Sequence, residues 1–328
     1  MSTLDTVATG PGDPLDLVPE PGVAGAIAAR SPLQLFWRRL REDRVAMAAL
    51  VFIVALILIA VFAPLVVKLF GAPPPDQQSS AALDQYGAPT GPSSKHLFGV
   101  DAVGQDIFSR VIYGARVSLA VAFISTGIAV AIGVVVGMLA GYYRGFVDTA
   151  LSRLMDVLLA FPILLLGLGL ASACALGNGC LGGLIQPGLT TVIFVIALAN
   201  WPYIGRIIRG QVLSLREKEF IEASRSLGAR DRRIIFREIL PNLVAPIIVY
   251  TTLAIPTNIL FEAALSFLGV GVQQPTASWG QMISDATAIF DTAWWYMLFP
   301  GVALVFTVLA FNLVGDGLQD ALNPRGDR

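Results

Sequence analysis

The chain has 328 residues, of which 55% are hydrophobic and 14% carry a charge, and its formal net charge is −1. Soluble domains carry about 25% charged residues, so this composition excludes an ordinary soluble enzyme and indicates a protein that lies in a lipid bilayer. The near-neutral charge gives no reason to expect a nucleic acid as a partner.

The N-terminal segment has the composition of a disordered tail. Its first 29 residues contain no Lys or Arg and four acidic residues, and they are rich in Pro, Gly and Ala. A secretory signal would begin with positive charge, so we expect a disordered cytoplasmic tail over 1–36 rather than a leader peptide. Segment 37–70 is expected to hold the first membrane helix as an uncleaved anchor, and 71–113 to form an external loop.

Uncharged apolar runs predict six membrane-spanning helices, since about 20 residues cross the hydrocarbon core. The run from Val157 to Gly205 is too long for one helix and contains GNGCLGGLIQPG, so it predicts two spans joined by an external turn near Gly177–Gly188. The sequence thus predicts an all-α, polytopic membrane protein with a five-helix core over 114–320 and a cytoplasmic tail over 321–328. The other four spans are Val45–Val67, Val117–Tyr143, Ile239–Phe261 and Thr292–Gly315.

Positive charge is concentrated on one side of the predicted membrane. Of the 22 Lys and Arg residues, 18 lie before the first span, in the loops after the second and fourth spans, or in the C-terminal tail. Cytoplasmic segments carry the excess of Lys and Arg, so we expect a multi-pass protein of the cell membrane with both termini cytoplasmic. The four on the opposite side are Lys68, Lys95, Arg110 and Arg116.

Glycine and proline indicate how the spans pack. Gly133, Gly137 and Gly141 form a ridge of small residues on the second span. Such ridges let helix backbones approach closely in lipid, so helix packing is favoured over a pore-lining role. Prolines inside the spans predict kinks. These prolines are Pro162, Pro202, Pro246, Pro256 and Pro300.

The cytoplasmic segment over 217–241 contains the most informative stretch, EASRSLGARDRRIIFREILP. Its five arginines require water, whereas Phe220, Ala223 and Leu227 share one helical face. Gly228 is the residue best able to end that helix. The sequence therefore predicts a helix, a glycine break and a second short helix before the fifth span begins.

This spacing resembles the EAA loop of membrane subunits of ATP-binding-cassette importers, E-A-A-x3-G-x9-I-x-L-P. Ser224 replaces the second alanine, and Glu238 stands where the pattern has Ile, with Ile239 one place later. In that family the loop docks into a cleft on a separate ATPase, and an amphipathic helix bound to anionic lipid is the alternative. The resemblance implies that the residues that couple this chain to the ATPase are Glu222, Ala223, Ser224, Leu227, Gly228, Arg232, Leu240 and Pro241.

The end of the external loop, KHLFGVDAVGQDIFSR, resembles a motif of the C-type membrane subunit of dipeptide and oligopeptide importers, H-x-x-G-T-D-x-x-G-R-D-x-x-S-R. Val100 replaces Thr and Gln105 replaces Arg in this motif. The segments Ala264–Pro275 and Asn312–Pro324 resemble the same peptide and nickel importer branch. The matching motif residues are His96, Gly99, Asp101, Gly104, Asp106, Ser109 and Arg110.

The resemblance implies one half of a translocation pore that works by alternating access. Its implied partners are a homologous second permease subunit, one or two types of ATPase subunit, an external solute-binding protein and the lipid bilayer. Short peptides are the expected substrates, and nickel chelates, glutathione and glycosides are alternatives within the branch. A secondary transporter driven by an ion gradient is the alternative from a different class, and it would work without an ATPase.

The residue types needed for catalysis or metal binding are not grouped in this sequence, so we expect no enzyme activity. Gly99 and Gly104 have the spacing of half a phosphate-binding loop, but Gln105 and Asp106 replace its Lys and Ser/Thr. We therefore expect no cofactor in this chain, with ATP and Mg²⁺ on the partner subunits. His96 is the only histidine and has no cysteine nearby, which argues against a metal site.

Three features leave two interpretations each. Glu262 follows the fifth span, where it lies either in headgroup water or along the translocation path, facing a peptide's ammonium group. Asp156 either pairs with Arg153 or is solvated. Cys174 and Cys180 lie in the predicted external turn, where a disulfide is preferred over two free thiols that pack as small apolar residues.

Overall fold

The computed structural model describes residues 32–175, 179–180, 183 and 185–322, which form helices and loops without a β-strand. Residues 1–31 of the predicted N-terminal tail and 323–328 of the C-terminal tail lie outside the described residues. The elements are α1 (Pro32–Glu42), α2 (Arg44–Val61), α3 (Ala63–Leu69), η1 (Ser80–Ala82), α4 (Ile107–Tyr143), α5 (Gly145–Ala160), α6 (Ile163–Ala175), α7 (Leu189–Arg216), α8 (Glu219–Ser226), α9 (Asp231–Arg233), η3 (Ile234–Ile239), α10 (Leu240–Phe267), α11 (Trp279–Ala286), η4 (Thr287–Ile289) and α12 (Trp294–Leu322).

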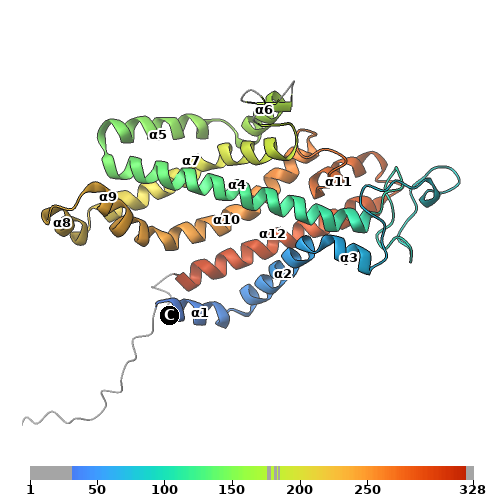
Figure 1. Ribbon diagram of the computed structural model, residues 1–328, viewed down its shortest axis with the longest axis horizontal. Coiled ribbons are helices and arrows are strands. Elements are labelled where there is room, and N and C mark those ends of the chain that lie inside the picture. Colours follow the sequence, from blue (N-terminus) through green and yellow to red (C-terminus); the bar gives the residue numbers. More distant parts are fainter. Residues whose placement is uncertain (1–31, 176–178, 181–182, 184, 323–328) are drawn as a thin grey trace, which may run out of the picture.

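The helices form an elongated bundle, with α8 and α9 at one end and the loop over 71–106 at the other (Figure 1). Within the described ranges, five helices are long and apolar enough to cross a membrane, or six if the bent pair α5 and α6 forms one span. The five are α2, α4, α7, the continuous helix Asp231–Phe267, and α12. The predicted all-α membrane fold is confirmed.

The helices α4 and α7 pack closely along the predicted glycine ridge. A Cβ atom at Gly137 would lie 2.5 Å from the carbonyl oxygen of Gly205, nearer than real Cβ contacts come. Added Cβ atoms at Gly133 and Gly141 would meet Ile204 and Val212 of α7 at 2.8 and 2.7 Å. This geometry agrees with the packing role expected for the ridge.

The helix α4 begins ten residues before the predicted span, since Arg110 and Arg116 interrupt the apolar sequence and the uncharged run starts only at Val117. The side chain of Asp106 caps the N-terminus of α4 by accepting a hydrogen bond from a backbone N–H of the first turn. A helix of 37 residues is about 55 Å long, so its first turns extend beyond a hydrocarbon core of about 30 Å. Residues 107–113 therefore belong to this helix and not to the loop.

The third predicted span begins near Val157, so most of α5 lies in the segment that the sequence predicts as a cytoplasmic loop. The helices α5 and α6 meet at 89°, and Phe161 and Pro162 separate them. Proline removes a backbone donor and clashes with the preceding turn, which explains a break at this position. Part of the turn expected near Gly177–Gly188 lies outside the described residues.

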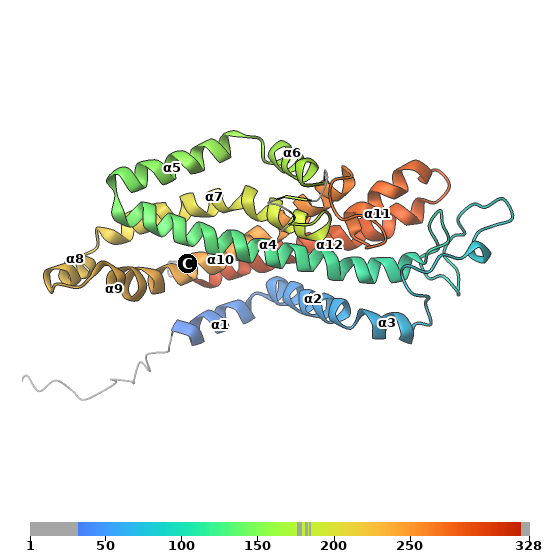
Figure 2. The ribbon, with the colours of Figure 1, turned by 45° about the horizontal axis from the view of Figure 1, so that its top comes forward.

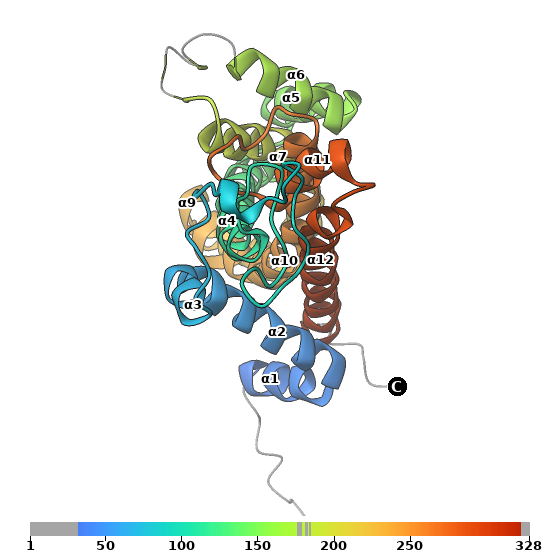
Figure 3. The same ribbon diagram turned by 90° about the vertical axis from the view of Figure 1, so that its right-hand side faces the viewer.

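The N-terminal helices α1, α2 and α3 form a layer along one side of the bundle (Figure 2). Seen from the end that carries the loop over 71–106, this layer lies opposite α5 and α6, with α4 and α10 between them (Figure 3). The predicted first span, Val45–Val67, is divided at Phe62, and Pro64 lies in the first turn of the new helix α3, where its missing N–H costs little. Asp43 caps α2 by accepting N–H groups from Val45 and Ala46.

The short helix α11, near the loop over 71–106, was not predicted from the sequence. Ser278 caps it by accepting the N–H of Gln281 at 3.3 Å. Trp279 is fully buried, and its indole N–H donates to the carbonyl oxygen of Val111 at 3.0 Å. This helix therefore packs onto the start of α4 and closes that end of the bundle.

Candidate functional site

The segment that carries the coupling motif projects from the end of the bundle as α8 and α9 (Figure 1). The side chain of Ile221 is fully buried and attaches α8 to the core of the bundle. Phe220 is 40% exposed and Leu227 is 88% exposed, and Glu222 and Ala223 are exposed as well. The predicted apolar face therefore points away from this chain and is available to another protein.

Gly228 ends α8 in a left-handed conformation, with φ of +77°. Its N–H donates to the carbonyl oxygen of Arg225 at 2.8 Å, and the N–H of Ala229 donates to that of Ser224 at 3.0 Å. These bonds form the expected helix end with a glycine in the left-handed position. A Cβ at Gly228 would meet no atom within 4 Å, so the backbone angle and not the available space requires glycine here.

The second half of the motif differs from the predicted separate short helix. The helix that begins at Asp231 continues through the π-helical turn η3 into α10 and ends at Phe267. Ile239 is fully buried, while Glu238, which occupies the place of the family's Ile, is half-buried. The second half of the motif and the fifth span therefore form one continuous helix. The other motif residues on this helix are Arg232 and Pro241, which are exposed, and Leu240, which is half-buried.

Tyr142, near the end of α4, contacts the coupling segment, and no sequence motif includes it. Its hydroxyl donates to Oδ1 of Asp231 at 2.7 Å. The guanidinium groups of Arg216 and Arg225 lie 5.8 and 5.6 Å from its ring centroid, and Arg216 also donates to its carbonyl oxygen. The only sequence signal was an aromatic pair at the end of an apolar run, typical of a membrane interface.

Ion pairs hold α5 against α7 at the same end of the bundle. Arg209 donates to both carboxylate oxygens of Asp148, at 2.5 and 2.9 Å. Asp156 is exposed and pairs with Arg206 at 2.5 Å, so its partner is Arg206 and not the Arg153 expected from the sequence. Paired carboxylate and guanidinium groups let α5 lie close to the long central helices.

The motif in the loop over 71–106 forms a buried polar cap on the first turn of α4. Asp106 accepts hydrogen bonds from the N–H of Ser109 and from His96, both at 2.8 Å. Gln105, which replaces the Arg of the family pattern, accepts from the buried Arg110 at 2.6 Å. Burial raises the pKa of Asp101, while hydrogen bonds from backbone N–H groups oppose the rise. This cap is structural.

The same cap explains two motif glycines. A Cβ at Gly104 would lie 2.1 Å from the carbonyl oxygen of Ser79, and one at Gly99 would lie 2.6 Å from the indole nitrogen of Trp295. The spacing that resembles a phosphate-binding loop is therefore required by packing. The described residues contain no group of three or more His, Cys, Asp or Glu side chains that could hold a metal ion.

Glu262 is fully buried inside the chain. Its two carboxylate oxygens accept hydrogen bonds from Ser118 of α4 at 2.9 Å and from Ser266 at 2.8 Å. Neither interpretation from the sequence, headgroup water or the translocation path, describes this position. The carboxylate instead links α10 to α4.

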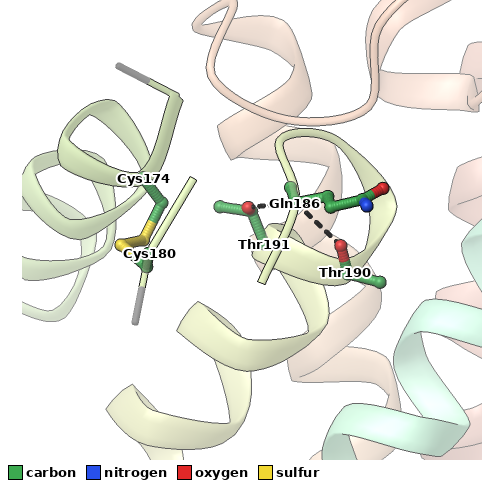
Figure 4. Close-up of a disulfide and its surroundings, with 5 residues drawn as sticks. All are labelled: Cys174, Cys180, Gln186, Thr190 and Thr191. Carbon is green, nitrogen blue, oxygen red and sulfur yellow. Dashed lines mark hydrogen bonds between the residues drawn. A yellow bond between two sulfur atoms is a disulfide. The ribbon is translucent and has the colours of Figure 1, made fainter. Parts of the chain in front are cut away.

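A disulfide joins Cys174, near the end of α6, to Cys180, with 4.7 Å between their Cα atoms (Figure 4). It lies just before α7, whose start is held by bonds from the hydroxyls of Thr190 and Thr191 to the carbonyl oxygen of Gln186, both at 2.7 Å. This pairing agrees with the interpretation preferred from the sequence.

Known proteins match the chain over nearly its whole length. Residues 133–328 match the family of binding-protein-dependent transport system inner membrane components, and residues 31–89 match the N-terminal TM domain of oligopeptide transport permease C. The chain is 40% identical over 297 residues to the dipeptide transport system permease protein DppC of Alkalihalophilus pseudofirmus, which covers 90% of this chain and 91% of that protein. It is 43% identical over 296 residues to the glutathione transport system permease protein GsiD of Escherichia coli, with coverage of 90% and 91%.

The fold is also found among solved structures. The inward-facing methionine ABC transporter MetNI matches with a TM-score of 0.54 at 22% identity, over 65% of this chain and 96% of that chain. The family match includes the coupling motif, and the oligopeptide permease match includes the helices α1 to α3. The chain therefore belongs to the binding-protein-dependent transport system inner membrane components, as a permease subunit of an ATP-binding-cassette importer of the dipeptide and oligopeptide branch.

Proposed function

We propose that this chain forms one half of the translocation pore of an importer for short peptides. The substrate class rests on the similarity of this chain to permeases named for dipeptide and glutathione transport. Dipeptides and glutathione both contain peptide bonds. Nickel chelates and glycosides are the alternatives within the same branch. Selectivity in such an importer also depends on the separate solute-binding protein.

The partners follow from the exposed coupling segment. We expect one or two types of ATPase subunit to bind the face with Phe220 and Leu227, a homologous second permease to complete the pore, and an external solute-binding protein to deliver substrate. ATP and Mg²⁺ bind on the ATPases, and this chain carries no cofactor and no catalytic residues. ATP binding draws the coupling segments together, and the continuous helix Asp231–Phe267 carries that motion into the membrane, where the cavity opens alternately to the two sides.

The proposed orientation places both termini in the cytoplasm of a multi-pass protein of the inner membrane. Two observations support it. Most Lys and Arg residues belong to the cytoplasmic side in this arrangement. The helix α1 and the C-terminal end of α12 also lie toward the same end of the bundle as α8 (Figure 1).

Uptake by the reconstituted importer tests this proposal. The chain is purified with its partner permease and ATPases, placed in liposomes with the solute-binding protein, and supplied with radiolabelled L-alanyl-L-alanine, glutathione, a nickel chelate or a glycoside. We expect ATP-dependent uptake of a compound that contains a peptide bond. Uptake of only the nickel chelate or the glycoside would contradict the peptide assignment. Transport by this chain alone under an ion gradient would establish the secondary transporter instead.

A further inference from the structure

A cavity of about 430 Å³ lies between the break of α5 and α6, α7 and α10. Its walls are apolar except for a few uncharged polar side chains. Thr257 lies ten residues from the end of α10, which corresponds to about 15 Å along the helix. The polar wall residues are Asn200, Tyr203, Tyr250, Thr257 and Asn258.

Asn258 contributes an unpaired polar atom to the wall of this cavity. Its side chain is 1% exposed, and its amide nitrogen donates to Oγ1 of Thr126 on α4 at 2.7 Å. Its carbonyl oxygen, Oδ1, is buried and has no hydrogen-bond partner among the described residues. A buried acceptor left unpaired is unfavourable, so this oxygen is suited to a donor that reaches it from the cavity when the side chain turns toward that space.

The polarity of the cavity indicates that it does not face lipid. Tyr203 is 61% exposed and Thr257 is exposed, although polar groups within membrane spans normally face protein or water. The broken backbone at Phe161 and Pro162 lies alongside, and such breaks at membrane depth are tolerated only in protein or next to water.

A hollow of similar size on α12 provides a contrast. Its walls, which include Trp294, Leu298, Val305 and Phe306, are almost entirely apolar. Val305 is 62% exposed and lies eleven residues from the start of α12, at a depth similar to that of Thr257. Such a surface suits lipid, so the two hollows distinguish a water-facing side of the bundle from a lipid-facing side.

We infer that the cavity beside Asn258 is a substrate contact in the translocation path, where Oδ1 accepts a hydrogen bond from a backbone N–H of a passing peptide. This inference rests on the proposed function and names the part of the pore that contacts its substrate. The wall residues of the cavity carry no charge. A charge-free wall with an unpaired amide oxygen suits the backbone, which all peptides share, because it offers no charge that would select among their side chains.

Cysteine labelling tests whether the cavity faces water, without any need for a substrate. Thr257→Cys and Val305→Cys are compared in the assembled importer, with a small cationic thiol reagent supplied from both sides of the membrane. We expect the Thr257→Cys thiol to react, with or without ATP, at least tenfold faster than the Val305→Cys thiol. Equal and slow reaction of both would mean that the cavity lies in lipid or is filled by protein, and would overturn the inference.

Transport of two nearly identical substrates tests the hydrogen bond itself. L-alanyl-L-alanine has a backbone N–H, whereas the ester analogue L-alanyl-L-lactate has an oxygen in its place. We expect Asn258→Leu to lower uptake of the dipeptide roughly fivefold relative to the ester, which is the size of one net hydrogen bond. Leu159→Ala changes another part of the same cavity wall without removing a partner of the Asn258 amide, and it should lower both uptakes equally.

The outcomes separate this inference from the function on which it rests. One outcome is that the wild-type importer is active and that Asn258→Leu shows the same ratio of dipeptide to ester uptake as wild type. That result would mean that Asn258 has only a structural role, and it would overturn the proposed substrate contact. If the wild-type importer hydrolyses ATP but takes up neither compound, the proposed peptide substrate is wrong and the peptide contact is overturned with it. In that case, fast labelling of Thr257→Cys would still place the cavity in a path for another substrate.

Discussion

The hydroxyl of Tyr142 donates a hydrogen bond to Oδ1 of Asp231 at 2.7 Å and so joins the last turn of α4 to the helix that follows Gly228. The guanidinium of Arg225, from α8, lies 5.6 Å from the centroid of the same tyrosine ring. Both halves of the coupling segment therefore meet one side chain of a central helix. In the proposed mechanism, a force applied to this segment by an ATPase would reach α4 through this contact and α10 through the continuous helix.

Tyr142→Phe removes this hydroxyl and keeps the aromatic ring beneath the arginines. Because the segment is then held less firmly, we expect fewer substrate molecules imported per ATP hydrolysed, and a loss of about 1 kcal/mol in stability. The measurement is uptake and ATP hydrolysis in the same liposomes. Tyr143→Phe is the matched control, because Tyr143 is 45% exposed and its hydroxyl makes no hydrogen bond within the described chain. Equal coupling in both variants would show that the Tyr142 bond plays no part in transmission.

Gly228→Val and Glu222→Lys should abolish transport while the chain still inserts into the membrane. Valine resists the left-handed angle at Gly228, and lysine reverses a charge on the exposed face of α8. The ATPase subunits should also dissociate more easily during purification. Gly210→Ala is the control, since a Cβ there meets no atom within 4 Å and no left-handed angle is involved. Normal uptake by both coupling variants, at normal expression, would contradict ATPase docking at this segment.

Gly137→Val should prevent stable packing of α4 on α7. The added Cβ would lie 2.5 Å from the carbonyl oxygen of Gly205, and backbone cannot yield as a flexible side chain can. We expect a loss of several kcal/mol, seen as low yield and a lowered melting temperature in detergent. Gly127→Val, on the same helix, is the control because a Cβ there meets no atom within 4 Å. Similar melting temperatures for the two variants would mean that the ridge does not determine helix packing.

The membrane spans could be predicted from the sequence because the thickness of a bilayer imposes a length on apolar runs. The ends of the helices were harder to predict. The helix α4 extends outward past Arg110 because that side chain is buried beside Gln105, and an isolated arginine in the sequence signals the end of a span instead. The start of α11 at Trp279 was missed because eight residues show no clear membrane pattern.

The sequence predicted those features of the site that depend on neighbouring residues in the chain, and not those that depend on distant ones. The turn at Gly228 was predictable because it depends on a backbone angle that glycine adopts. The burial of Glu262 was not, because its partner Ser118 is 144 residues away. The same holds for the bond from Tyr142 to Asp231, which joins residues 89 positions apart. Contacts of this kind depend on how the helices pack, which the local sequence does not specify.

Cysteine labelling will establish the orientation of the chain. Gln77 and Ser226 are exposed and lie toward opposite ends of the bundle. With the native cysteines replaced by serine, Gln77→Cys should react with a membrane-impermeant reagent in intact cells, and Ser226→Cys only after permeabilisation. The charge distribution is the physical basis of this expectation. The reverse pattern would place the coupling segment outside the cytoplasm and overturn the proposed mechanism.

The disulfide between Cys174 and Cys180 can be tested by counting thiols. The two Cα atoms are 4.7 Å apart, within the roughly 4.4–6.8 Å that a disulfide requires, and the proposed orientation places the pair on the oxidising side of the membrane. In protein denatured without reductant we expect no thiol to react with a maleimide reagent, and after reduction we expect two.

The stabilisation from so small a loop should be modest, at about 2 kcal/mol. A disulfide that closes a shorter loop removes less conformational entropy from the unfolded chain. The double variant Cys174→Ser/Cys180→Ser should therefore melt at a slightly lower temperature and still transport, since the bridge attaches the end of α6 to the segment before α7 without entering the cavity beside Asn258. Two reactive thiols in the unreduced protein would rule the bridge out. Loss of transport in the double variant at normal expression would instead give the bridge a part in the transport cycle.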